Sequence, residues 1–158
     1  MSSVTMHRIR TVELFAGCRR SQFERIDRLG YTMVLPPERQ LCVEGESASE
    51  FFVLVDGLVD VRVSTGRVAR LYPGAWFGEL GLIDNARRRA TVTTVVQSMF
   101  IVYGRREFNT LLTLAPPVRE RLQRNASLVL RGKMPRHRPW YQPILDGPRL
   151  EANEYSWT

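Results

Sequence analysis

Residues 77–92 read Phe-Gly-Glu-Leu-Gly-Leu-Ile-Asp-Asn-Ala-Arg-Arg-Arg-Ala-Thr-Val, and they decide how the rest of the chain is interpreted. Gly78 predicts a turn that leads into a short helical turn beginning near Glu79. The free backbone N–H groups at the start of such a turn favour an anion. Arg88 follows nine residues after Glu79, at the start of a β-branched run, and can fold back toward the same place.

The residue types of this stretch suit a ribose phosphate. The planar donor fork of a guanidinium matches the oxygens of a phosphate. A carboxylate cannot itself bind phosphate, but it can accept hydrogen bonds from a sugar hydroxyl, as the acidic residue of dinucleotide sites does. Glu79 and Arg88, together with the backbone amides, therefore predict a ribose-phosphate site.

The residues around this stretch have the composition of short β-strands. From about residue 40 to 102, β-branched and aromatic runs are separated by glycines, at positions 45, 57, 66, 74 and 78. Val59, Val61 and Val63 alternate with Asp60 and Arg62, which is typical of a half-buried antiparallel strand. Short strands with glycine turns between them predict an antiparallel β-roll or jelly roll.

Helical spacing precedes and follows the β region. Ser21 and Glu24 have the pattern of a capping box, and the helix that they open is expected to end before Gly30. After the β region, one helix is predicted from residue 105 to the proline pair at 116–117, and a second from about 117 to 131. The apolar stripe of the second helix is more typical of packing within the chain than of a dimer seam.

These elements define a fold that is mainly β with flanking helices. Residues 1–11 are expected to form a loose lead-in, and residues 12–132 the folded domain, with one helix before the roll and two after it. Residues 133–158 are rich in proline and are predicted to be an extended tail that Trp140 and Tyr141 anchor.

The charge of the chain is concentrated late in the sequence. The formal net charge of the 158 residues is +7, and residues 101–138 carry nine basic and two acidic residues. A basic segment can contact nucleic acid or an anionic membrane, although a solvated arginine-rich helix face is the commoner case. No run approaches the roughly 18 apolar residues of a transmembrane helix, and no signal-peptide core is present. We therefore expect a cytoplasmic protein.

The sequence offers no set of catalytic or metal-binding residues. Cys18 and Cys42, with His7 and His137, are too few for a disulfide framework or a metal cluster, and both cysteines are expected to be reduced. Both histidines lie outside the predicted fold, so no nucleophile and base can be paired, and a Walker loop is absent. We expect neither an enzyme nor a protein with a cofactor.

Residues 77–92 resemble the phosphate-binding cassette of cyclic nucleotide-binding domains, where Phe-Gly-Glu-Leu-x-Leu-Ile is followed by x-Arg-x-Ala-Thr-Val. Such domains occur in protein kinase A regulatory subunits, catabolite activator-type regulators and cyclic-nucleotide-gated channels. The resemblance covers roughly residues 12–131. Its further landmarks are residues 44–46, 52–54, 57–61 and 71–74.

The resemblance implies a role for each matching cassette residue. Glu79 would accept a hydrogen bond from the ribose 2′-hydroxyl, Arg88 would pair with the cyclic phosphate, and Gly78 would permit close approach. The backbone amides that would line the phosphate belong to Leu80, Gly81 and Arg89.

The resemblance is less specific for the base. Val61 and Leu71 would pack on the purine from the interior of the roll. Asn125, Ser127 or an aromatic residue of the tail would cap the base.

The cassette departs from the family pattern at three positions. Arg87 stands where proline is usual, Arg89 where a small residue is usual, and Gly81 where alanine is usual, which is a mild change. The position of Arg89 often helps to choose the base, and threonine there tends to favour cGMP. Arg89 could add a phosphate contact or crowd the pocket, and solvent exposure of Arg87 and Arg89 is an equal alternative.

Together, these features predict a stand-alone sensor of a cyclic nucleotide, with cAMP favoured over cGMP. We expect this sensor to act through a protein partner or through self-association by its last helix. Residues 133–158 are too few for a DNA-binding domain, so we expect no attached effector and no DNA binding. A second interpretation is a degenerate roll in which Glu79 and Arg88 form a buried ion pair. Such a roll would bind a protein or a nucleic acid through residues 101–138. A third is a regulatory piece of a separately encoded enzyme.

Overall fold

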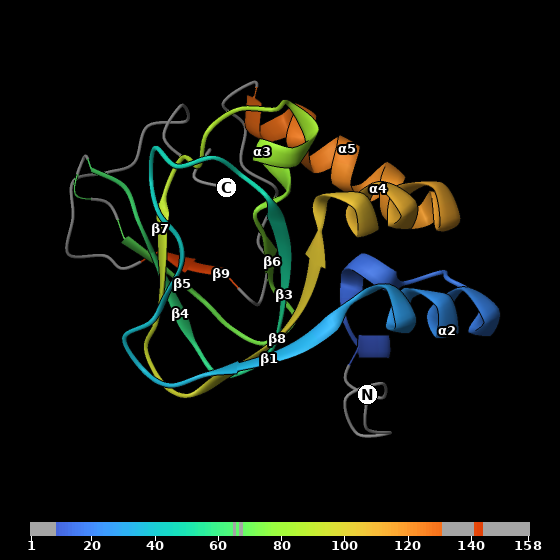
Figure 1. The fold of residues 1–158 in the computed structure, drawn as a ribbon, viewed down its shortest axis with the longest axis horizontal. Helices are drawn as coiled ribbons and strands as arrows, with labels where there is room; N and C mark the ends of the chain where they lie inside the picture. The colour runs from blue at the N-terminus through green and yellow to red at the C-terminus, as the bar shows by residue number, and fades with distance from the viewer. Residues whose placement is uncertain (1–8, 65, 67, 131–140, 144–158) are drawn as a thin grey trace.

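The structure is a computed structural model that describes residues 9–64, 66, 68–130 and 141–143. Two antiparallel β-sheets curl around a common interior, and the helices gather at one side of this roll (Figure 1). The strands are β1 (Tyr31–Leu35), β2 (Gln40–Cys42), β3 (Glu50–Asp56), β4 (Val59–Arg62), β5 (Val68–Leu71), β6 (Trp76–Phe77), β7 (Thr91–Thr94), β8 (Ser98–Gly104) and β9 (Tyr141–Pro143). The helices are η1 (Glu13–Phe15), α2 (Arg20–Leu29), α3 (Glu79–Ile83), α4 (Arg105–Leu114) and α5 (Pro116–Leu130).

The predicted fold class, a mainly β roll with flanking helices, is confirmed. One sheet has the strand order β1-β8-β3-β6 and the other β2-β7-β4-β5-β9. Glycines hold the turns that the sequence predicted, because Gly57 and Gly74 both have positive φ, at 100° and 99°.

Strand β3 separates the two hydrophobic clusters of the molecule. Its continuous apolar run is buried on both faces, which is why it lacks the alternation of a half-exposed strand. Phe51 and Val53 face the helical side, where α4 and α5 cover the sheet, and Phe52 and Leu54 face the interior of the roll. The ring of Phe52 stacks on that of Phe77 at a centroid distance of 5.1 Å.

The helices agree with the predicted ranges except at one terminus. The capping box that begins α2 does not use Ser21 and Glu24: the N-cap is Arg19, whose backbone N–H donates to Oε1 of Gln22 at 2.8 Å. The prediction was wrong because an amide side chain at the third helical position can satisfy the N-cap amide from a start two residues earlier. In α5, Val118 and Leu122 are fully buried in the cluster on the helical side, so the stripe packs within the chain.

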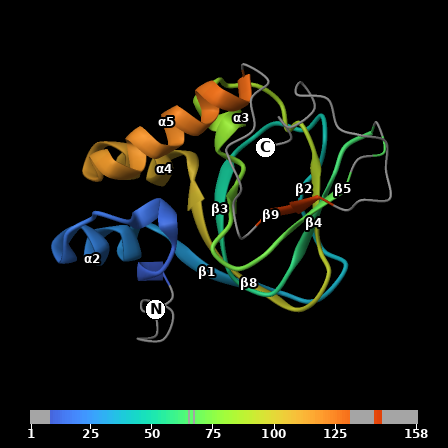
Figure 2. The ribbon, with the colours of Figure 1, turned by 180° about the vertical axis from the view of Figure 1, so that it is seen from behind.

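Residues at both ends of the described chain pack on the roll: Ile9 joins the core on the helical side, and residues 141–143 form a strand. Ile9 lies in the predicted lead-in, but it is only 2% exposed and belongs to the core cluster on the helical side. The predicted tail returns to the roll as β9, which pairs antiparallel with β5 so that Tyr141 lies opposite Leu71 (Figure 2). Trp140, the other predicted anchor, lies outside the described residues.

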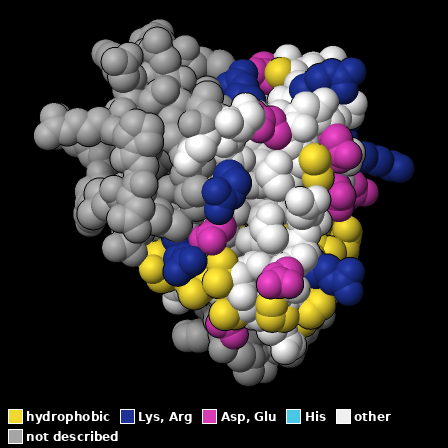
Figure 3. Space-filling model, turned by 90° about the vertical axis from the view of Figure 1, so that its left-hand side faces the viewer, with side chains coloured by type: hydrophobic (Ala, Val, Ile, Leu, Met, Phe, Trp, Pro, Cys, Tyr) yellow, Lys and Arg dark blue, Asp and Glu magenta, His cyan; other side chains and the backbone are white. Residues whose placement is uncertain are grey.

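The face formed by β7, β4 and β5 carries charges of both signs. Arg70 and Asp60 are cross-strand neighbours there and form a salt bridge of 2.9 Å. Figure 3 views this side of the molecule and shows basic and acidic side chains interspersed on its described surface. The described part of this face therefore carries no patch of a single sign.

Candidate functional site

The candidate site begins where β6 ends and the short helix α3 starts. Gly78 is the N-cap of α3 and has φ 92° and ψ −3°, a left-handed conformation that glycine adopts without steric cost. A Cβ atom at this position would lie 2.7 Å from Nη1 of Arg88 and 2.9 Å from the carbonyl oxygen of Glu50. Glycine is therefore required for two reasons, the backbone angle and the close approach of the arginine.

Arg88 is buried against the start of this turn. Its Nη1 donates to the carbonyl oxygen of Gly78 at 2.9 Å, and its Nη2 donates to that of Glu50 at 2.7 Å. Its guanidinium carbon lies 5.9 Å from the ring centroid of Phe52. The side chain is only 6% exposed, so these contacts fix the position of its charge.

The loop that carries Arg88 is paired along its backbone with residues 45–47. The N–H of Arg88 donates to the carbonyl of Glu46 at 2.8 Å, and the N–H of Gly45 donates to the carbonyl of Arg88 at 2.9 Å. Nη1 of Arg87 donates to the carbonyl of Gly45 at 2.9 Å. This pairing gives the segment at 44–46 a function: it holds the main chain of the arginine loop. Arg87 is exposed apart from that bond.

Glu79 is buried at the first position of α3. Its residue is 6% exposed, and its Oε2 atom is buried without a hydrogen-bond partner. Burial raises the pKa of this carboxyl to about 7, although its own backbone N–H and the charge of Arg88 both lower the pKa. Among the salt bridges of the described residues none joins Glu79 to Arg88, so the ion pair of the degenerate-roll interpretation is not present.

Gly81 is more constrained than the sequence indicated. A Cβ atom on it would lie 2.4 Å from Cβ of Ala48 and 3.0 Å from the carbonyl oxygen of Ala86. The exchange of the usual alanine for Gly81 is therefore not mild in this chain, because Ala48 occupies the space that a side chain at 81 would need. Leu80, next to it, is buried with 1% exposure.

The side chain of Arg89 binds a carboxylate of the protein. Its Nη2 lies 2.6 Å from Oδ2 of Asp84, and each side chain is 25% exposed. This ion pair holds the guanidinium of Arg89 beside the end of α3, where the residue is half-buried. Contact of its side chain with a phosphate stays a prediction. The role of the backbone amides of Leu80, Gly81 and Arg89 toward a phosphate remains a prediction.

The residues expected near a base lie in two places. Val61 and Leu71 are buried, with exposures of 1% and 2%, in the interior cluster of the roll. Asn125 is 8% exposed on α5, which packs near α3, whereas Ser127 is exposed (Figure 2). Contact of any of them with a base stays a prediction.

Three residues near the site were not predicted from the sequence, because each contributes through a backbone atom or through a contact formed only in the folded chain. Glu50 contributes a carbonyl oxygen, Ala48 contributes its size, and Asp84 contributes a carboxylate; none carries a local signal for this. Cys42 is buried in the interior cluster of the roll, with 5% exposure. Burial raises the pKa of its thiol to about 12 while the charge of Arg88 lowers it, which places Cys42 close to the site.

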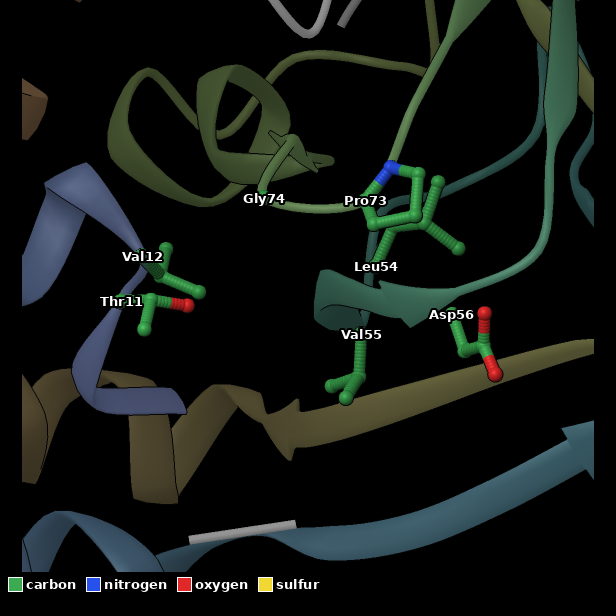
Figure 4. A pocket seen from close by; sticks show the side chains of 7 residues that line it. All are labelled: Thr11, Val12, Leu54, Val55, Asp56, Pro73 and Gly74. Atoms are coloured by element: carbon green, nitrogen blue, oxygen red, sulfur yellow. The ribbon is translucent and has the colours of Figure 1, made fainter. Parts of the chain in front are cut away.

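A separate pocket lies between the N-terminal segment and the turn before β6. It has a volume of about 320 Å³ and is lined by Thr11, Val12, Leu54, Val55, Asp56, Pro73 and Gly74 (Figure 4). No predicted site residue lines this pocket. Over the described ranges, no group of three or more His, Cys, Asp or Glu side chains could hold a metal ion. No helix in the described part of the chain has the length and apolar character of a membrane span.

The sequence matches the family model of the cyclic nucleotide-binding domain over residues 32–114, which is more than half of the chain. The chain belongs to this family. The matched range contains strands β2 to β8, all of β1 but its first residue, and the cassette with Glu79 and Arg88.

The chain is also similar to curated proteins, two of which are compared with it as follows. It is 28% identical to the Pycsar effector protein XpPycTIR of Xanthomonas perforans, over 77% of this chain and 39% of that protein. It is 31% identical to the cAMP-dependent protein kinase regulatory subunit of Yarrowia lipolytica, over 60% of this chain and 25% of that protein. The chain thus spans well under half the length of these relatives.

Solved structures share the fold. The regulatory domain of Toxoplasma gondii PKA, crystallised with cAMP, gives a TM-score of 0.71 at 21% identity, covering 79% of this chain and 49% of that chain. The catabolite activator protein of Thermus thermophilus gives a TM-score of 0.67 at 23% identity, covering 75% of this chain and 58% of that chain.

Proposed function

We propose that this chain binds a 3′,5′-cyclic nucleotide through Glu79 and Arg88, with cAMP preferred over cGMP. The observation that carries the proposal is the buried Oε2 atom of Glu79, which has no partner. An unsatisfied buried polar group is destabilising, so proteins rarely retain one without a function. A ribose 2′-hydroxyl would donate to this oxygen and remove the penalty.

Arg88 supports the same proposal by the way it is held. A guanidinium has five N–H donors, and two of its nitrogen atoms donate here to carbonyl oxygens. Those two bonds fix the orientation of the fork and leave further donors for the equatorial oxygens of a phosphate. A buried guanidinium with no salt bridge among the described residues supports an anion as its ligand.

The preference for cAMP rests on a feature that position 89 lacks, and not on a contact of Arg89 with the base. No threonine hydroxyl is present there to favour cGMP, and the guanidinium of Arg89 is engaged by Asp84. The Yarrowia relative is named as a cAMP-dependent regulatory subunit, which is in keeping with this preference.

The chain would act as a non-catalytic regulator through a partner or a second copy. The helix α5 packs near α3 and against η1, so a ligand at the cassette would bias the position of the last helix (Figures 1 and 2). Two arginines of the basic segment already have structural roles: Arg105 donates to the carbonyl of Ala48 at 2.8 Å, and Arg121 to that of Leu14 at 3.0 Å. This reduces the basic surface available to a ligand-free interaction module.

The test is a calorimetric titration with cAMP and with cGMP, using 5′-AMP as a noncyclic control. Glu79→Gln and Arg88→Gln should each weaken binding at least about tenfold, since each removes a charge-assisted hydrogen bond. Arg70→Gln is the matched control, because Arg70 also pairs across strands but lies on the outer face, and it should leave the affinity unchanged. Absence of heat and of any thermal shift at millimolar cyclic nucleotide would overturn the proposal and favour the degenerate roll.

A further inference from the structure

The ion pair between Asp84 and Arg89 joins the two ends of the loop that carries Arg88. Asp84 is the C-cap of α3, and Arg89 lies two residues before β7. The distance from Nη2 of Arg89 to Oδ2 of Asp84 is 2.6 Å. The loop is therefore closed by a side-chain bond at its base, with Arg88 next to that bond.

The same carboxylate also shapes the interior of the loop. Oδ1 of Asp84 accepts a hydrogen bond from the N–H of Ala86 at 3.1 Å. Asn85 between them has φ 56°, a left-handed conformation that asparagine tolerates better than most residues. Each oxygen of Asp84 thus fixes a different part of the path between α3 and Arg88.

We propose that Arg89 is a positioning residue: through Asp84 it holds the loop that presents Arg88, and it sets the affinity for every cyclic nucleotide alike instead of choosing the base. This inference rests on the proposed function. It assigns to Arg89 a role different from base selection, because its guanidinium is engaged at the end of α3.

The charges of the loop give a second reason for the pair. An unpaired Asp84 carboxylate would add a negative charge to the loop that carries Arg88 and would disfavour an anion there. Arg89 neutralises that carboxylate at short range. Loss of Arg89 should therefore weaken phosphate binding in two ways, through a looser loop and through an unbalanced negative charge.

The experiment compares this pair with a matched pair elsewhere. Asp84→Asn, Arg89→Gln and the double variant are titrated with cAMP and with cGMP by calorimetry. Amide hydrogen exchange of residues 84–89 is measured in the ligand-free proteins. Asp60→Asn is the control, since Asp60 and Arg70 form a pair of 2.9 Å whose side chains are exposed to a similar degree, 25% and 34%.

Arg89→Gln should weaken cAMP and cGMP by the same factor, roughly threefold to tenfold. Asp84→Asn should also weaken both nucleotides equally but by a smaller factor, because it loosens the loop without leaving an unbalanced negative charge. Both variants should speed amide exchange in the loop. The double variant should be no weaker than the weaker single variant, because the two side chains act as one unit. The control should bind within about twofold of wild type.

Three results would overturn the inference. A loss that differs between cAMP and cGMP would show base selection at position 89, an unchanged affinity would show an idle pair, and unchanged exchange would show that the pair does not hold the loop. If the wild-type chain binds neither nucleotide, the proposed function fails, and the exchange measurement alone still decides whether Asp84 and Arg89 position the loop.

Discussion

Glu79 and Arg88 are buried in one site, yet they do not neutralise each other by a salt bridge. Arg88 donates to the carbonyl oxygens of Gly78 and Glu50, and Oε2 of Glu79 is buried without a partner. Burial therefore disfavours the charged form of the Glu79 carboxyl and raises its pKa to about 7, within the physiological range. The arrangement leaves an acceptor and a cation for two separate contacts with one ligand.

The affinity for a cyclic nucleotide should rise with pH between about 6 and 8. In the proposed complex a ribose hydroxyl donates to the ionised form of Glu79, and that form is depleted below its pKa of about 7. For a ligand that binds only the ionised form, the apparent Kd is inversely proportional to the ionised fraction of Glu79, so Kd should fall about tenfold from pH 6 to pH 8. Calorimetric titration at three pH values measures the slope.

Glu79→Gln is the control for this titration, because it has the same shape and no ionisation in this range. Its weaker affinity should be independent of pH. A wild-type affinity that is equally flat would show that the ligand does not sense the ionisation of Glu79.

The stability of the ligand-free protein should respond to pH with the opposite sign. The pKa of Glu79 is 4.5 in the reference state and about 7 when folded, so the folded state binds more protons between these values. The protonated carboxyl of Glu79 therefore contributes fully to the free energy of unfolding at pH 4.5 and below. This contribution is lost as the pH rises through 7, and the loss is about 3 kcal/mol at most. Urea unfolding should find Glu79→Gln more stable than wild type at pH 8 but not at pH 5. Equal effects of the substitution at both pH values would contradict this.

Gly81 and Ala48 should behave as a size-complementary pair. Gly81→Ala places a methyl group 2.4 Å from Cβ of Ala48, and such overpacking costs about 1–3 kcal/mol. Ala48→Gly removes the obstructing methyl group, so the double variant should recover part of the loss. Urea unfolding of the four proteins forms a double-mutant cycle, and a double variant whose loss equals the sum of the single losses would refute the steric explanation.

Alanine variants at Gly78 and Gly74 allow the effect of backbone strain to be measured apart from the effect of steric contact. Both have positive φ, at 92° and 99°, but a Cβ atom on Gly74 meets nothing within 4 Å, whereas one on Gly78 meets Arg88 at 2.7 Å. Substitution by alanine should destabilise both proteins by about 1 kcal/mol through φ alone. Only Gly78→Ala should also weaken cyclic nucleotide binding, by displacing the arginine, and the calorimetric comparison of the two variants measures this. Equal affinities would mean that Arg88 does not depend on the space at Gly78.

The parts of the fold that were predictable are those that local periodicity encodes. The unbroken apolar run of β3 matches a strand buried on both faces, and glycines mark turns that need positive φ. The approach of Arg88 to the start of α3 was expected from the spacing of the two residues, because a nine-residue segment made of a short helical turn and a loop can return to its start. These features depend on neighbours in sequence.

The unpredicted parts depend on residues that are distant in sequence. Ala48 determines what position 81 tolerates, and the pairing of β9 with β5 depends on where residues 141–143 return to the roll. The capping box at Arg19 was missed for a different reason, since two overlapping patterns competed and the structure uses the earlier one. Periodicity cannot decide contacts of these kinds, because each is set by packing in three dimensions.

In the proposed complex, the ribose 2′-hydroxyl donates to the buried Oε2 atom of Glu79, and the cyclic phosphate pairs with Arg88 beside it. The most direct test compares the affinities of cAMP and 2′-deoxy-cAMP for wild type and for Glu79→Ala. Wild type is expected to prefer cAMP at least about tenfold, and Glu79→Ala is expected to bind both nucleotides equally weakly, because the 2′-hydroxyl then has no carboxylate to donate to. A wild-type protein that binds the two nucleotides equally well, or a variant that keeps the full preference, would contradict it.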